Sequence, residues 1–265
     1  MQDCDHFSKD YSEFSVPLVS ILTVTKNSQN TIKDCLLSVD RQTYPNIEHI
    51  VVDGSSDDDT LNLVSKYKRP LGEVLSEPDK GIYDALNKAL KMANGEIIGF
   101  LHSDDVFADK KVIETVTNKM IIENVDGIYG DLVYVTKNDK KKIIRTWKSS
   151  KFSPDKLYMG WMPPHPTLFL KASWYERLGG FDDSFKISAD YKFILRLFSS
   201  ESFNVAHISK VLTLMSVGGA SNKSLKNLIH KMKEDWRALE VISSSPLQKL
   251  FTLVLKSLSK LNQLF

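Results

Sequence analysis

The stretch Glu96-Ile97-Ile98-Gly99-Phe100-Leu101-His102-Ser103-Asp104-Asp105 places two adjacent carboxylates directly after a short apolar run. The run Glu96–Leu101 has the length and composition of a buried β-strand. Two carboxylates at the end of such a strand are costly unless a cation or hydrogen-bond donors compensate them. Mg²⁺ and Mn²⁺ prefer oxygen ligands of this kind and also bind substrate phosphates. The alternative is an ordinary Asp-rich turn, or a helix N-cap before Val106.

Strands alternate with helices in the segment that precedes this stretch. The apolar, β-rich runs Leu18–Val24 and Ile47–Val52 predict two further strands. Apolar residues at helical spacing predict helices at 32–39, 60–67 and 83–93, and Asn94-Gly95 ends the last of them. This alternation predicts an α/β fold with a mostly parallel central sheet flanked by helices.

Polar residues follow each of the three predicted strands. Thr25-Lys26-Asn27 follows the first strand, Asp53 the second and Asp104-Asp105 the third. Ligands of parallel sheets bind outside the carboxyl ends of the strands, so we expect these residues to gather around one ligand. Asp53 can accept hydrogen bonds from a base or a ribose. The acidic run Asp57–Asp59 precedes a predicted helix and is expected to stabilise its N-terminus.

A lysine lies in the loop that leads into the third helix. Lys80 belongs to the segment Glu77-Pro78-Asp79-Lys80-Gly81-Ile82-Tyr83-Asp84. A lysine near the predicted carboxylates can neutralise phosphate charge. A solvated loop is the alternative explanation for this segment.

The second half of the chain has a different pattern. Gly127–Val135 and Lys142–Trp147 predict two strands joined by the lysine-rich turn Lys137–Lys141. Helices are predicted after Ser173 and over Ala189–Ser199, and the pattern is again helical from residue 222 onward.

Three residues of this half carry ionisable side chains that need a function or a structural explanation. Asp190 lies in the first turn of a predicted helix, where the helix dipole alone favours a carboxylate. His165 lies between two prolines, and neither it nor His207 has a partner at metal-ligand spacing. Both histidines are therefore expected to be structural.

The composition excludes several classes of protein. The 265 residues are 42% hydrophobic, which is enough for one sizeable core, and the net charge of +2 argues against a nucleic-acid binder. The first residues lack the basic and apolar regions of a signal peptide, and no apolar run approaches the roughly 18–20 residues that span a bilayer. Cys4 and Cys35 form no metal or redox spacing, and Cys35 is expected to be buried. These features fit a reducing cytoplasm.

Six segments together resemble the GT-A fold of family 2 glycosyltransferases. The resemblance is to bacterial enzymes of O-antigen, capsule and exopolysaccharide assembly, including the colanic-acid type. It implies a glycosyltransferase domain over 17–221, with a nucleotide-binding half over 17–105 and an acceptor half over 106–221. Residues 1–16 would be an N-terminal extension, and 222–265 a C-terminal helical segment. The segments that carry the resemblance are Val19–Asn27, Val51–Asp57, Glu77–Asn87, Leu101–Asp105, Gly179-Gly180-Phe181-Asp182, and Ala189-Asp190-Tyr191 with Arg196.

The resemblance implies a role for each candidate residue. Asp190 matches the family's catalytic base, Asp105 would hold Mn²⁺ or Mg²⁺ on the diphosphate, and Asp104 would touch the ribose or the sugar. The remaining contacts to the nucleotide-sugar donor would come from Thr25, Lys26, Asn27, Asp53 and Lys80. The implied reaction is a single displacement that inverts the anomeric configuration, with a UDP-sugar as the expected donor.

The chain departs from the family pattern at two places beside these residues. Many relatives carry Asp-Asp-Gly-Ser after the second strand, with the second Asp on the base, and this chain has Gly54 there. Relatives also often have Asn or Tyr where this chain has Lys26 and His102.

Two other functions compete with this interpretation. A nucleotidylyltransferase or a dehydrogenase expects a glycine-rich loop after the first strand, and residues 25–30 contain no glycine. A non-catalytic member that binds nucleotide-sugar or serves as a scaffold is the other alternative. The chain retains all four candidate carboxylates, which argues against this alternative; they are Asp53, Asp104, Asp105 and Asp190.

The C-terminal stretch Pro246–Phe265 carries an apolar face with basic residues and no acidic residue. Such a helix suits the surface of an anionic membrane, which predicts peripheral contact at the inner face of the cytoplasmic membrane. The alternative is a helix packed on the catalytic domain or on a partner in an oligomer.

Overall fold

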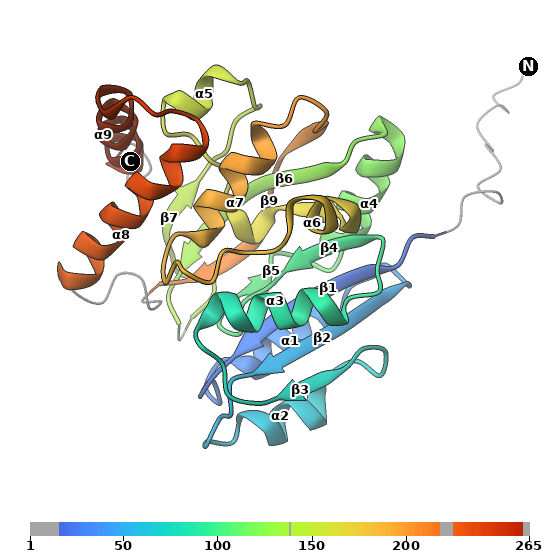
Figure 1. Ribbon diagram of the computed structural model, residues 1–265. Helices are drawn as coiled ribbons and strands as arrows, with labels where there is room; N and C mark the ends of the chain where they lie inside the picture. Colours follow the sequence, from blue (N-terminus) through green and yellow to red (C-terminus); the bar gives the residue numbers. More distant parts are fainter. Residues whose placement is uncertain (1–15, 138, 218–224, 262–265) are drawn as a thin grey trace, which may run out of the picture.

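The computed structural model describes residues 16–137, 139–217 and 225–261 (Figure 1). The strands are β1 (Val19–Thr25), β2 (Ile47–Asp53), β3 (Val74–Ser76), β4 (Ile97–Phe100), β5 (Val106–Phe107), β6 (Gly127–Val135), β7 (Ile143–Trp147), β8 (Phe169–Lys171) and β9 (Val205–Ser216). The helices are α1 (Ile32–Asp40), α2 (Thr60–Tyr67), α3 (Ile82–Met92), α4 (Val112–Glu123), α5 (Asp155–Tyr158), α6 (Ala172–Leu178), α7 (Ala189–Phe198), α8 (Leu225–Ala238) and α9 (Pro246–Leu261). Two short 3₁₀ helices are η1 (His165–Thr167) and η3 (Leu239–Val241).

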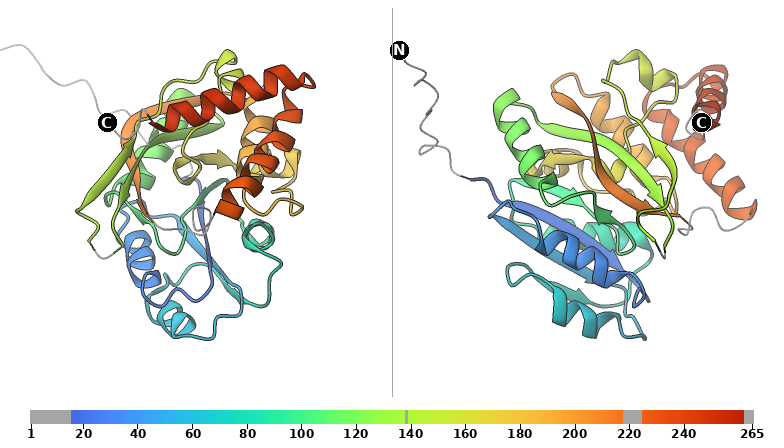
Figure 2. Two further views of the ribbon diagram at one scale, coloured as in Figure 1. Left: turned by 90° about the vertical axis from the view of Figure 1, so that its left-hand side faces the viewer. Right: turned by 180° about the vertical axis from the view of Figure 1, so that it is seen from behind.

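The first half of the chain forms a parallel sheet in the order β3-β2-β1-β4. Every residue of β1 and β2 is buried, as expected for strands covered on both faces. The register places Thr25 opposite Asp53, so the polar residues after these strands start from the same edge. Helices α1 and α2 cover one face and α3 the other (Figures 1 and 2). The expected α/β fold is confirmed.

The second half extends the same sheet through strands of mixed direction. The antiparallel strand β8 joins β4 to β6, and β6 pairs in parallel with the long strand β9. Most of the paired residues in the whole sheet lie in parallel ladders. Helix α4 packs beside α1 in one apolar cluster, and α6 and α7 share the opposite cluster with α3. The Cys35 side chain is buried in the first cluster, as expected.

Several elements of this half have no clear pattern in the sequence. The strand β9 is interrupted by polar side chains such as His207 and Lys210, and β3, β5 and β8 are three residues long or shorter. Neighbouring strands therefore determine these elements more than local periodicity does.

The helices α8 and α9 pack along the side of the acceptor half (Figure 2). The Glu234 carboxylate of α8 is buried and accepts hydrogen bonds from three successive backbone N–H groups, those of residues 186–188. The Lys256 ammonium of α9 lies 3.0 Å from the Asp235 carboxylate, and both side chains are buried. The inner face of the C-terminal segment is thus part of the protein core. The domain boundary predicted at 221/222 lies outside the described residues.

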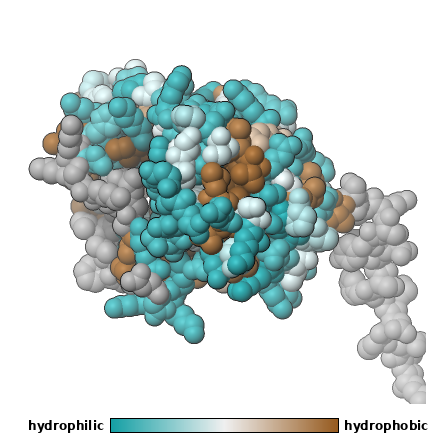
Figure 3. All heavy atoms as spheres, turned by 90° about the horizontal axis from the view of Figure 1, so that it is seen from below, coloured by the Kyte–Doolittle hydropathy of each residue, from teal (hydrophilic) through white to brown (hydrophobic). Residues whose placement is uncertain are grey.

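The surface seen from below is mostly hydrophilic, with a hydrophobic patch near the centre and smaller hydrophobic areas elsewhere (Figure 3). Across the described part of the chain, none of the helices combines the length and hydropathy needed to cross a membrane.

Candidate active site

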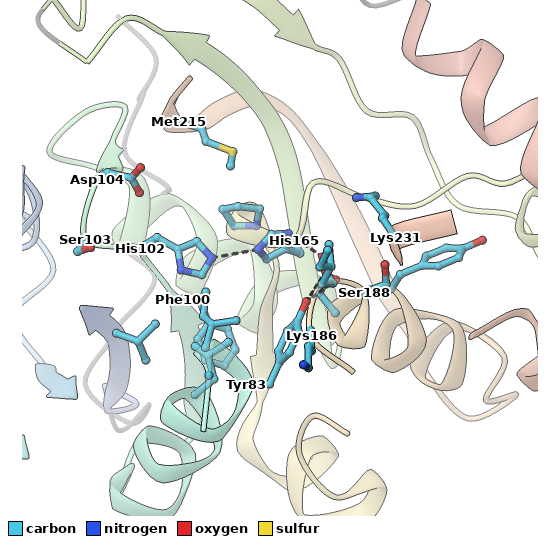
Figure 4. A pocket seen from close by; sticks show the side chains of 18 of the residues that line it. Tyr83, Phe100, His102, Ser103, Asp104, His165, Lys186, Ser188, Met215 and Lys231 are labelled. Atoms are coloured by element: carbon cyan, nitrogen blue, oxygen red, sulfur yellow. Dashed lines mark hydrogen bonds and ion pairs between the residues drawn. The ribbon is translucent and has the colours of Figure 1, made fainter. Parts of the chain in front are cut away.

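A cleft of about 1860 Å³ lies at the carboxyl ends of β1 and β4 and reaches across to α8 (Figure 4). Cationic side chains outnumber carboxylates along its wall. The cations are Lys26, Lys137, Arg145, Lys186, Lys231, Lys233 and Lys256, and the carboxylates are Asp79, Asp104, Asp190 and Asp235. A surplus of positive charge in a concave site favours an anionic ligand such as a diphosphate.

The loop after β1 forms one end of this cleft. Thr25, Lys26 and Asn27 all line it. Asn27 adopts a left-handed backbone conformation (φ 50°), its N–H donates to Ser56 Oγ at 2.8 Å, and its Oδ1 accepts the N–H of Asp57 at 3.0 Å. The buried Thr25 Oγ1 has no hydrogen-bond partner among the described residues. The structure therefore brings these three predicted donor contacts together at one end of the cleft.

Asp53 lies beneath this loop and outside the cleft wall. Its side chain is fully buried, and its carboxylate accepts from the N–H and hydroxyl of Ser56 and from the Ser76 hydroxyl. These contacts organise the loop that follows β2. A contact between Asp53 and a base stays a prediction, as does the donor contact of Lys80, which also lies outside the lining residues.

Another carboxylate fills the space beside Asp53. A β-carbon added to Gly54 would lie 2.2 Å from Asp79 Oδ2. Asp79 lines the cleft, and its Oδ1 accepts the Gly81 N–H at 2.9 Å. The absent side chain at Gly54 thus leaves room for the Asp79 carboxylate. The sequence carried no signal for this, because the two residues lie 25 positions apart.

The adjacent carboxylates after β4 have different surroundings. Asp104 lines the cleft, whereas Asp105 is fully buried and its Oδ1 accepts the Ser216 N–H at 3.0 Å. Burial raises the pKa of Asp105 well above its usual value, and the neighbouring Asp104 raises it further. Within the described residues, Asp105 Oδ2 accepts no hydrogen bond.

This carboxylate pair is compatible with a divalent cation. No three His, Cys, Asp or Glu side chains of the described chain converge on a common metal position. Mg²⁺ and Mn²⁺ often bind through one or two carboxylates and take their other ligands from phosphates and water. The buried, unpaired Oδ2 of Asp105 beside Asp104 fits that mode, and the assignment of Asp105 as the metal ligand stays a prediction.

Asp190 lies on the same cleft at the start of α7. His165 Nδ1 lies 3.3 Å from Asp190 Oδ2, and the Tyr83 hydroxyl lies 3.1 Å from Asp190 Oδ1. Burial raises the pKa of Asp190, but the neighbouring His165 and Lys231 and the backbone hydrogen bond from Tyr191 together lower it by more. The pKa of this carboxyl is therefore below its usual value, and Asp190 is ionised near neutral pH.

Two histidines form a chain behind Asp190. His165 Nε2 lies 3.1 Å from His102 Nε2, and the two rings point toward one another (Figure 4). Burial lowers the pKa of both rings, that of His102 to about 3. The expectation that His165 is only structural missed this contact, because its partners come from distant parts of the chain. His207, by contrast, lies 3.6 Å from Asp131 and is not among the residues that line the cleft.

Comparison with known proteins agrees with this architecture. Residues 20–186 match the model of glycosyl transferase family 2. The chain is 34% identical over 187 residues to an uncharacterized glycosyltransferase of Mycobacterium tuberculosis, covering 69% of each protein. It is 28% identical over 213 residues to a PGL/p-HBAD biosynthesis glycosyltransferase of Mycobacterium bovis, covering 78% of this chain and 80% of that protein.

Solved structures share the fold at low sequence identity. Residues 1–349 of Staphylococcus aureus TarS in complex with UDP-GlcNAc superpose with a TM-score of 0.67 at 19% identity, covering 93% of this chain and 72% of that one. The mannosyltransferase PcManGT of Pyrobaculum calidifontis, in complex with GDP-Man and Mn²⁺, gives a TM-score of 0.62 at 19% identity and covers 92% and 70%. The chain spans only 43% of a longer TarS structure. On the family match and the sequence relatives, this chain belongs to glycosyl transferase family 2, and it has the GT-A fold.

Proposed function

We propose that the chain is an inverting, metal-dependent glycosyltransferase of cell-surface polysaccharide biosynthesis. It transfers a sugar from a nucleotide diphosphate carrier to a hydroxyl of a glycan or a lipid-linked oligosaccharide. The observation that carries the proposal is the ionised carboxylate of Asp190 on the wall of the cleft that Thr25 and Asp104 also line. A carboxylate with a pKa below neutrality can accept a proton from an alcohol as that alcohol attacks.

The proposed reaction is a single displacement at the anomeric carbon. Asp190 takes the proton of the acceptor hydroxyl while its oxygen forms a bond to that carbon. The bond between the carbon and the diphosphate breaks on the opposite face, and the electron pair leaves with the nucleotide diphosphate. The cationic side chains of the cleft, Lys26 among them, offset the charge on the leaving group. A divalent cation held by Asp105 beside Asp104 would supply further stabilisation of that charge.

The donor is proposed to be a UDP-sugar carrying a hexose or an N-acetylhexosamine. The TarS structure named above binds UDP-GlcNAc, whereas PcManGT binds GDP-Man, so the shared fold accommodates either nucleotide. The free hydroxyl of Thr25 and the carboxylate of Asp79 are hydrogen-bonding groups at the donor end of the cleft.

A panel of nucleotide sugars tests this proposal without knowledge of the acceptor. We expect slow hydrolysis of one donor in the presence of Mn²⁺, measured as release of the nucleotide diphosphate, and loss of that activity in EDTA. The Asp190→Asn variant should lose about 10²–10⁴-fold in turnover while it still binds the nucleotide. Asp183→Asn, an exposed carboxylate in the preceding loop, is the matched control and should be unchanged.

The same panel separates the enzyme from its alternative, a non-catalytic binding or scaffolding member. Binding of a nucleotide sugar by calorimetry with no turnover of any donor or acceptor would favour the scaffold. Turnover by Asp190→Asn at the wild-type rate would instead refute the assignment of the base.

We further propose that the outer face of α9 contacts the membrane surface at the inner side of the cytoplasmic membrane. Its exposed residues form an apolar stripe, Leu247, Leu250, Phe251, Val254 and Leu258. The expected basic flank is not found at Lys249 and Lys256, because both side chains are buried and pair with Glu240 and Asp235. The proposed contact is therefore hydrophobic rather than electrostatic.

Vesicle flotation tests this contact. The full chain should float with zwitterionic as well as anionic vesicles, because the α9 lysines named above do not face outward. Replacing Leu250 and Phe251 by Ser should abolish flotation, whereas Ser257→Ala, an exposed change on the same helix, should not. A concentration-dependent dimer that does not float would show instead that the stripe binds a second copy.

A further inference from the structure

The catalytic carboxylate proposed above is held by side chains on both of its oxygens. His165 Nδ1 lies 3.3 Å from Oδ2 of Asp190. The Tyr83 hydroxyl lies 3.1 Å from Oδ1 and 2.6 Å from the Ile187 carbonyl oxygen. The two partners come from η1 and α3, so two separate parts of the chain converge on the carboxylate that α7 carries.

The positions of the hydrogens in the His102–His165 pair follow from their neighbours. A lone pair on His165 Nδ1 would face the negative oxygen of Asp190, so Nδ1 carries the hydrogen of the neutral ring. A neutral His165 then has a lone pair on Nε2, and His102 Nε2 must carry the hydrogen between the two rings. The pKa values of both rings are lowered by burial, in agreement with two neutral imidazoles. His102 therefore donates to His165, whose Nδ1–H lies on the side of Asp190.

The opposite oxygen of Asp190 has a different partner. The Tyr83 hydroxyl has one hydrogen and two acceptors within reach, the Ile187 carbonyl oxygen and Oδ1 of Asp190. The two oxygens of Asp190 therefore have separate neighbours, Tyr83 at Oδ1 and His165 at Oδ2.

We infer that His165 is a positioning residue, which fixes the rotation of the Asp190 carboxylate, and that His102 holds His165 in the required tautomer. The inference rests on the proposed function of Asp190. His165 itself does not act as the base, because its Nδ1 hydrogen already points at the carboxylate. Lys231 of α8 and Lys256 of α9 also face Asp190, and Asp235 is the ion-pair partner of Lys256.

Two substitutions of His165 distinguish the loss of its Nδ1–H group from a simple change in side-chain size. In His165→Asn the amide nitrogen is attached at the same branch point as Nδ1 and can still donate to Asp190. In His165→Gln the amide reaches toward His102 instead, and the donor to Asp190 is lost. We expect His165→Gln and His165→Ala to lower kcat on the order of 10- to 100-fold with the donor KM unchanged, and His165→Asn to restore most of kcat.

The pH profile provides a second readout. The electrostatic contact with His165 lowers the pKa of Asp190, so its loss should raise that pKa. The acid limb of kcat should therefore move to higher pH in His165→Gln and remain near the wild-type position in His165→Asn. Equal loss of kcat in both variants with an unmoved acid limb would overturn the inference, because a merely structural defect would behave that way.

Nitrogen-15 NMR of the histidine rings tests the arrangement independently of turnover. We expect His165 as the Nδ1–H tautomer and His102 as the Nε2–H tautomer, with signals assigned through His165→Asn and His102→Gln. His165 found as the Nε2–H tautomer would overturn the inference even in a fully active enzyme. If no donor is turned over but these tautomers are found, the proposed function fails while the predicted hydrogen-bond chain stands.

Discussion

Glu234 offers a sharp test of how the C-terminal helices support the active site. Its carboxylate is 3% exposed and accepts the N–H groups of Lys186, Ile187 and Ser188 at 2.7, 2.8 and 2.9 Å. These groups precede α7, the helix that carries Asp190 at its second residue. Replacement by Ala removes the acceptor of three backbone donors at once.

The expected magnitude follows from those three hydrogen bonds. Each hydrogen bond to a charged group contributes about 1.5–3 kcal/mol. Their simple sum is an upper bound, because Glu234→Ala also removes the cost of burying a carboxylate and lets water reach the freed N–H groups. We therefore expect the free energy of unfolding to fall by about 3–5 kcal/mol, the range for removing one partner of a buried charged contact. The Gln variant keeps one acceptor oxygen and should lose less.

Urea unfolding followed by fluorescence measures this change. Glu201→Ala is the control, because its side chain is exposed. Surface substitutions of this kind usually change the free energy of unfolding by no more than about 0.5 kcal/mol. If Glu234→Ala were no more destabilising than Glu201→Ala, α8 would not anchor the start of α7 and the reasoning would be refuted. The loosened helix start should also lower kcat in the Ala variant.

Three further predictions test other parts of the structure. Gly54→Asp should weaken UDP binding at least about ten-fold, measured by calorimetry. The new β-carbon would lie 2.2 Å from Asp79 Oδ2, and the new carboxylate would repel the Asp79 carboxylate. Unchanged affinity would show that Asp79 is not at the nucleotide. Lys256→Met should lower the free energy of unfolding by about 3–5 kcal/mol, because the Asp235 carboxylate stays buried without its cation. The double variant Lys256→Met with Asp235→Asn should recover part of this loss. Burial, together with the charges of Lys68 and Arg69, lowers the pKa of His49 from 6.5 to about 3. Between these two pH values the unfolded chain binds more protons than the folded chain, so stability falls as the pH drops below about 6.5. The contribution of His49 should fall by about 2 kcal/mol between pH 7.5 and pH 5, and a His49→Gln variant with the same pH slope as wild type would contradict this.

The first half of the fold could be predicted because its signals are local. Each signal spans only a few consecutive residues. Apolar runs predict β1, β2 and β4, and helical spacing of apolar residues predicts α1, α2 and α3. The parallel arrangement then brings the ends of these strands to one edge, which is why Thr25 and Asp104 line one cleft as expected.

The rest of the site depends on contacts between distant residues, which no local pattern reports. His165 contacts His102, which lies 63 residues earlier in the sequence, and Asp190, which lies 25 residues later. Neither spacing belongs to a known motif. Asp53 has the residue type of a ligand contact, but loop hydroxyls engage both of its oxygens. The lysines of the C-terminal segment were expected at the surface, but Lys249 and Lys256 are buried, and Lys256 pairs with the buried Asp235.

The late position of β9 in the chain has a consequence for biosynthesis. The strand β6 has its longest ladder with β9, and Gly127 pairs with Val205. A nascent chain that has emerged only to β8 can assemble the parallel half, but β6 lacks this neighbour and β5 lacks its pairing strand altogether. Contacts so remote in sequence form slowly because the intervening loop must close first. A translational pause before β9 has emerged from the ribosome would therefore prolong an aggregation-prone intermediate, whereas a pause after β9 has emerged would not.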